Sequence, residues 1–117
     1  MMQNDLKDRT KKFAIDCWVL CSKLPKTREY NAYVNQLIKC SSSVGANYRA
    51  SQRAKSTRDF INKLKIVEEE ADESSYFLEL LGTVCDLFPE EIKRLQRESE
   101  EILAIMVSSI NTARKKL

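Results

Sequence analysis

Apolar and small side chains recur along this chain at alternating spacings of three and four residues. The pattern is most regular between residues 60 and 85, at Phe60, Leu64, Val67, Ala71, Ser74, Leu78, Leu81 and Cys85. This spacing places side chains on one face of an α-helix. Similar stripes run through residues 6–24, 30–48 and 92–113, and Ala14, Trp18 and Cys21 widen the first of them. The sequence therefore predicts four amphipathic helices.

Prolines and capping residues indicate where these helices end. Pro25 disfavours helical geometry at Leu24, and Pro89 suits the first turn of a helix. Ser56 or Thr57 is the expected N-cap of the third helix. The predicted helices cover residues 4–23, 28–53, 57–85 and 89–115. Because the connections are short, we expect an all-α, antiparallel up-and-down four-helix bundle, with a single domain over residues 1–117.

The residue types available argue against catalysis. Histidine, the usual general base and the commonest metal ligand, is absent. Four cysteines occur without a CxxC pair, which argues against a zinc knuckle, so we expect them in the core. Cys17 and Cys21 would share one helix face, which leaves metal or redox chemistry as the alternative. The run of carboxylates at residues 68–73 is expected to be solvated or paired with basic groups. We expect no enzymatic activity, no cofactor and no metal.

Hydropathy predicts a cytoplasmic protein that self-associates. No run of 18 apolar residues exists, and the N-terminal residues lack the apolar stretch of a signal peptide. Several apolar residues lie beside or outside the main stripes, at Tyr33, Ile38, Ile61, Ile66, Phe77, Leu103 and Val107. Some of them will complete the core, but their number favours a subunit interface. We expect a homo-oligomer, whose subunit number the spacing does not give.

The stretch SSSVGANYRA at residues 41–50 brings poor helix formers into the second predicted helix. Apolar positions on both sides keep the helical register, so we expect the helix to continue through it. Small residues at Ser41 and Gly45 would then let a neighbouring helix approach closely. A compatible interpretation makes Asn47 a buried polar anchor, whose amide bonds a carboxylate or backbone group on the next helix.

Basic residues follow this stretch directly. Residues 1–60 contain 12 Lys/Arg and 5 Asp/Glu, whereas residues 61–117 contain 8 and 12. Such asymmetry suits an anionic partner or self-association between unlike surfaces. The candidate nucleic-acid-binding residues are Arg49, Arg53, Lys55, Arg58 and Lys63. Arginine forks match phosphate oxygens, so RNA or DNA would be bound with little sequence specificity and strong salt dependence. Alternatively, this cluster is a solvated tip or pairs with the acidic run.

The segment from residue 41 to 81 resembles a known family of four-helix bundles. That family is named after proteins encoded in intervening sequences of bacterial 23S ribosomal RNA genes. It also includes the accessory variability determinants of diversity-generating retroelements. The matching features are the S-x-x-x-N element at residues 43–47, the basic turn at 53–58, the pattern from Asp59-Phe60 to Leu64, the following acidic segment and the aromatic-leucine run at 77–81. A leucine-proline turn at residues 24 and 25 extends the resemblance to nearly the whole chain.

The resemblance implies a ring-like homopentamer without enzymatic activity. Its retroelement members bind nucleic acid and a reverse transcriptase through a basic surface, and Arg49, Arg53, Lys55 and Arg58 match that surface by position. This chain departs from them in being only mildly basic, with a pI of about 8.7. The function we expect is binding of RNA or a nucleoprotein partner by a non-catalytic homo-oligomer. The alternative is a structural or protein-interaction oligomer with no nucleic-acid role.

Overall fold

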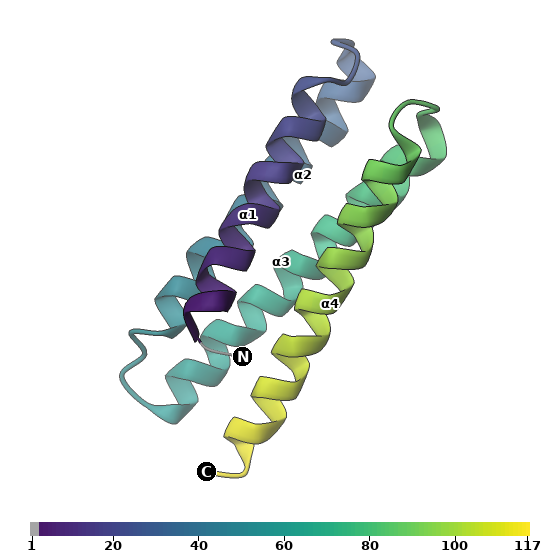
Figure 1. Cartoon of the computed structure of the whole chain (residues 1–117). Helices are drawn as coiled ribbons and strands as arrows, with labels where there is room; N and C mark the ends of the chain where they lie inside the picture. Colours follow the sequence, from purple (N-terminus) through teal and green to yellow (C-terminus); the bar gives the residue numbers. More distant parts are fainter. Residues whose placement is uncertain (1–2) are drawn as a thin grey trace.

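The computed structural model describes residues 3–117 as an antiparallel bundle of four helices (Figure 1). They are α1 (Gln3–Ser22), α2 (Arg28–Ser51), α3 (Thr57–Val84) and α4 (Pro89–Arg114). The bundle measures 47 × 22 × 21 Å along its principal axes, and α1 begins and α4 ends toward the same end of it. The four-helix prediction is confirmed, with every helix end within two residues of its expected position.

Local capping explains where the helices begin. The Thr27 hydroxyl accepts a hydrogen bond from the backbone N–H of Tyr30 at the start of α2. The Ser56 hydroxyl accepts from the backbone N–H of Asp59 at the start of α3, as the sequence predicts. Phe88 precedes Pro89 with a φ of 56°, in the left-handed region that bulky residues rarely adopt. The centroid of its ring lies 4.4 Å from Nζ of Lys23, so the residue that follows α1 contacts the turn that reverses the chain into α4.

The core consists of the predicted stripes. Every α3 position from Leu64 to Leu81 that keeps the spacing of three and four residues is buried, and Cys85, just after the helix, is buried too. All four cysteines are buried free thiols, as expected for small core residues. The buried polar residues are small, and Ser74 shows how they are accommodated, because its hydroxyl donates to the Glu70 carbonyl at 2.8 Å. Regular apolar spacing thus sets both the helices and their packed faces.

The apolar residues outside the main stripes divide into two groups. Ile61 is buried, and Tyr33, Ile38, Phe77 and Leu103 pack against the core from its margin, whereas Ile66 and Val107 are exposed. The expectation that Trp18 widens the first apolar stripe is wrong. Its side chain is 59% exposed, since α1 turns the neighbouring row with Cys17 and Leu20 inward. Within the described chain, none of the four helices is long and apolar enough to span a lipid bilayer.

Candidate nucleic-acid interface

Basic side chains gather along a groove between α1 and α2. The hollow has a volume of about 530 Å³. Its lining consists of Lys7, Thr10, Lys11 and Ala14 from α1 and Ser42, Gly45, Ala46, Arg49 and Arg53 from α2 and the turn after it. We call this hollow the basic groove. It contains two of the five predicted nucleic-acid-binding residues, Arg49 and Arg53.

Small residues form the floor of the basic groove. A β-carbon built on Gly45 would lie 3.4 Å from Thr10 Oγ1, so the two helices approach closely at this point. The Thr10 hydroxyl is satisfied locally, since it donates to the Leu6 carbonyl at 2.8 Å. Ser41 is buried beside this contact, and its hydroxyl donates to the Ile38 carbonyl at 3.3 Å. Gly45 therefore lies at van der Waals distance from α1, and Ser41 is buried one turn before it on α2.

Four cationic side chains border this floor. Lys7 and Lys11 lie one turn apart on α1, while Arg49 and Arg53 lie four residues apart on the opposite wall. All four are exposed, and none of them forms an ion pair with a carboxylate of the described chain. Like charges that share a groove without a counter-charge attract anions.

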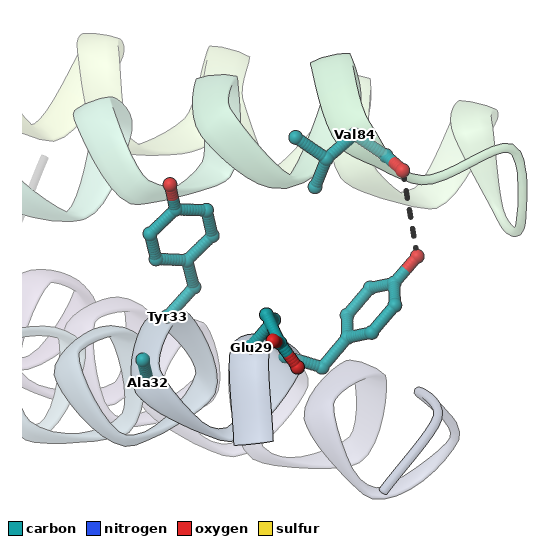
Figure 2. A pocket seen from close by; sticks show the side chains of 5 residues that line it. Glu29, Ala32, Tyr33 and Val84 are labelled. Carbon is teal, nitrogen blue, oxygen red and sulfur yellow. Dashed lines mark hydrogen bonds between the residues drawn. The ribbon is translucent and has the colours of Figure 1, made fainter. Parts of the chain in front are cut away.

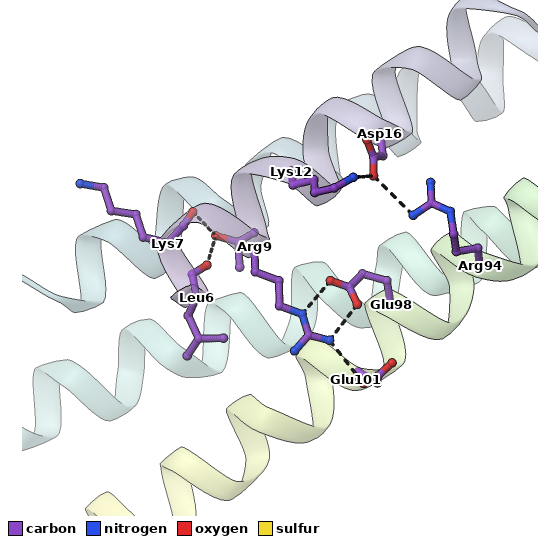
Figure 3. A network of polar contacts seen from close by, with 9 residues as sticks. Leu6, Lys7, Arg9, Lys12, Asp16, Arg94, Glu98 and Glu101 are labelled. Atoms are coloured by element: carbon purple, nitrogen blue, oxygen red, sulfur yellow. Dashed lines mark hydrogen bonds and ion pairs between the residues drawn. The ribbon is translucent and has the colours of Figure 1, made fainter. Parts of the chain in front are cut away.

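Three other charged residues of α1, Arg9, Lys12 and Asp16, form ion pairs, and two of them reach α4 (Figure 3). Arg9 donates through Nε and Nη2 to the two carboxylate oxygens of Glu98, both at 2.7 Å. Asp16 accepts from Lys12 at 2.7 Å and from Arg94 at 3.4 Å. Hydrogen bonding to Glu98 raises the pKa of Arg9, so this cation stays charged. Lys7 extends away from this network in Figure 3.

Comparison with known proteins identifies the family. The sequence matches the family model described as 23S rRNA-intervening sequence protein over residues 2–108. The chain belongs to this family. It is also 33% identical to a protein of unknown function from the S23 ribosomal protein family of Bacteroides thetaiotaomicron, whose crystal structure superposes with a TM-score of 0.85. That match covers 95% of this chain and 99% of the other. The search of curated proteins gave no match.

The 23S rRNA-intervening sequence protein family is the one that the sequence resembles, so that expectation is confirmed. Both descriptions connect the family with the ribosome or its RNA, which is compatible with an association with RNA. Neither description names a class of enzyme. Among the described residues, no group of three or more potential ligands could hold a metal ion.

The remaining predicted site residues of this family member lie outside the basic groove. Lys63 Nζ donates to both carboxylate oxygens of Asp59, at 2.7 and 2.8 Å. The backbone N–H of Lys55 donates to the same carboxylate at 3.0 Å, and these bonds lower the pKa of Asp59. Lys55 borders a different hollow near the end of α4, and Arg58 is exposed on the first turn of α3. The predicted cluster therefore divides between the groove and the turn from α2 to α3.

Asn47 forms its hydrogen bond within α2. Its amide Nδ2 donates to the Ser43 carbonyl at 2.8 Å, and the side chain is half-buried. This differs from the interpretation of Asn47 as an anchor to the next helix. A carbonyl one turn earlier lies within reach of the amide without any rearrangement of the helix.

Sequence reasoning missed Lys7 and Lys11. Their spacing of four residues places them on one helix face, which is the signal that could have drawn attention to them. The sequence does not show, however, that this face lies opposite Arg49 and Arg53. That relationship arises only when α1 packs against the small residues of α2.

A second hollow of about 410 Å³ lies between α2 and α3, and we call it the aromatic groove (Figure 2). It is lined by Glu29, Tyr30, Ala32, Tyr33 and Val84. The Tyr30 hydroxyl donates to the Val84 carbonyl at 3.5 Å. Nearby, the ring of Phe77 lies 6.1 Å from that of Tyr33 and 5.6 Å from that of Tyr76. This face is aromatic where the basic groove is cationic.

Proposed function

We propose that this protein is a non-catalytic homo-oligomer that binds RNA, alone or in a nucleoprotein, through the basic groove and with little sequence specificity. The proposal rests on one observation: Lys7 and Lys11 line one wall of the basic groove, and Arg49 and Arg53 line the opposite wall. Each of these cations is exposed and has no carboxylate partner within the described chain. A phosphate backbone supplies the missing negative charge.

The shape of the basic groove suits a backbone that lies between two helices. Ser42, Gly45 and Ala46 carry no long side chain that would fill it. The guanidinium groups of Arg49 and Arg53 match phosphate oxygens in a forked geometry, while the lysines on the other wall act as point charges. Release of counterions from the RNA would then supply much of the binding free energy.

The lining also accounts for the low sequence specificity. It contains no amide or carboxylate side chain, and these are the groups that commonly pair with adenine and cytosine edges. The Thr10 hydroxyl already donates to a backbone carbonyl. Contacts to phosphates fix the position of a nucleic acid but do not read its sequence.

Self-association is supported by the aromatic groove. Tyr76 and Val84 are exposed large apolar residues near it, and exposed apolar patches commonly mark protein interfaces. We propose this face as the subunit contact of the homopentamer that the family resemblance implies, which leaves the basic groove open. Light scattering at micromolar concentration tests it. An oligomer that Tyr76→Glu dissociates supports the proposal, and a monomeric wild-type protein contradicts it.

RNA binding is tested by fluorescence anisotropy with a labelled 20-nucleotide single-stranded RNA at low salt. We expect Arg49→Gln/Arg53→Gln to bind at least about tenfold more weakly than the wild type, since two phosphate contacts are lost. The control is Lys93→Gln/Arg97→Gln, because these exposed cations are also four residues apart but lie on α4, outside the groove. Absence of wild-type binding, or equal weakening in both variants, contradicts the proposal.

A further inference from the structure

Trp18 is the single tryptophan of the chain and is exposed on α1. It borders a hollow of about 230 Å³ between α1 and α2, which we call the tryptophan hollow. The other lining residues are Cys21, Ser22, Pro25, Lys26, Asn31, Val34 and Ile38. An exposed indole beside a mainly apolar hollow is available to a ligand.

The tryptophan hollow continues the line of the basic groove. On α1, Trp18 follows Lys7 by 11 residues and Lys11 by seven, close to whole numbers of helical turns, so the three share one side of the helix. On α2, Ile38 of the tryptophan hollow lies one turn before Ser42, which lines the basic groove together with Arg49. The surface between the helices therefore passes from cationic to apolar over about 16 Å between Lys7 and Trp18.

The apolar end offers a ring rather than a charge. The one cation that lines the tryptophan hollow is Lys26, and its ammonium group donates to the Ser22 carbonyl at 3.1 Å and the Leu24 carbonyl at 3.3 Å. These two hydrogen bonds hold the ammonium group of Lys26 at the end of α1. A cationic track that leads to an aromatic ring is the combination that binds single-stranded nucleic acid, because phosphates follow the cations while a base stacks on the ring.

We propose that the two hollows bind one single strand, with its backbone along the basic groove and a base stacked on Trp18. This rests on the proposed function and specifies the nucleic acid as single-stranded. At the rise of about 3.4 Å per nucleotide of a base-stacked strand, a length of about 16 Å corresponds to roughly five nucleotides. Bases of a duplex are paired and stacked within it, so they do not reach Trp18 while the backbone follows the lysines.

The emission of Trp18 reports directly on this contact. We expect a ten-nucleotide single-stranded RNA to quench it and to protect it from acrylamide, whereas the matched duplex does neither. A single-stranded DNA of the same sequence distinguishes stacking from recognition of the ribose, and equal quenching supports the stacking contact. In anisotropy measurements, Trp18→Ala should weaken single-strand binding by about tenfold, while Trp18→Phe should retain most of it.

Three results overturn this inference. Single-strand binding that leaves the Trp18 emission unchanged refutes the stacking contact, although the proposed function survives. Emission that is already shielded from acrylamide in the free protein, and becomes accessible on dilution, shows that a second copy covers Trp18. Absence of any RNA binding refutes both the inference and the proposed function. Because Trp18 is exposed, circular dichroism of Trp18→Ala should match the wild type, which verifies that the variant is folded.

Discussion

Gly45 of α2 faces Thr10 of α1 so closely that a β-carbon at position 45 would lie 3.4 Å from Thr10 Oγ1. This close approach forms the floor of the basic groove. It also brings the lysines of α1 opposite the arginines that follow the small residues of α2. A packing contact between two small residues thereby sets the geometry of a charged surface.

Two substitutions at Gly45 should change stability in opposite directions. Gly45→Ala adds a methyl group at ordinary contact distance and removes the helix penalty of glycine, so we expect a gain of about 0.5 to 1 kcal/mol. Gly45→Leu should overpack the contact with Thr10 and cost about 1 to 3 kcal/mol. Thermal unfolding followed by circular dichroism measures both effects. A leucine variant that melts with the wild type contradicts the close packing.

The Arg9–Glu98 pair should contribute measurably to the attachment of α1 to α4. Its two bonds are both 2.7 Å, and each side chain is only 23% exposed. We expect a double-mutant cycle with Arg9→Gln and Glu98→Gln to give a coupling of about 0.5 to 1 kcal/mol in urea unfolding. The matched control is Arg28–Glu29, which is 92% and 74% exposed, and its coupling should be close to zero. Equal couplings would contradict this account.

The buried cysteines should be unreactive in the native protein. Burial raises the pKa of Cys21 to about 11 and also raises that of Cys17. Because the thiolate is the reactive form, its fraction at pH 8 is about one in a thousand for Cys21. A thiol reagent should label all four cysteines only after denaturation. Native labelling within seconds would show that the core opens readily.

Asp59 should stabilise the turn between α2 and α3 in a pH-dependent way. Its hydrogen bonds with Lys63 and the Lys55 backbone lower its folded pKa below the unfolded value. The contribution is therefore present above the unfolded pKa of about 3.9 and is lost as pH falls through the folded pKa. Asp59→Asn should lower the melting temperature at pH 7 and change it little near pH 2. Equal effects at both pH values would contradict the role of the charge.

The helices and the core were predictable because they depend on local pattern. The burial of Leu64, Val67 and Leu78 follows from spacing alone, and the start of α3 follows from Ser56. The basic groove was only half predictable, since the position of Lys7 opposite Arg49 depends on how two helices pack. Trp18 was misplaced for a similar reason. A side chain at the edge of an apolar stripe is buried only if a neighbouring helix covers it, and no neighbour within the described chain covers this one.

The salt dependence of RNA affinity tests the basic groove most directly. For single strands, the slope of log K against log salt falls by about 0.7 for each phosphate contact removed. We therefore expect Arg49→Gln/Arg53→Gln to reduce the slope by about 1.4 relative to the wild type, while Lys93→Gln/Arg97→Gln leaves it unchanged. The same slope for all three proteins would contradict RNA binding in the basic groove.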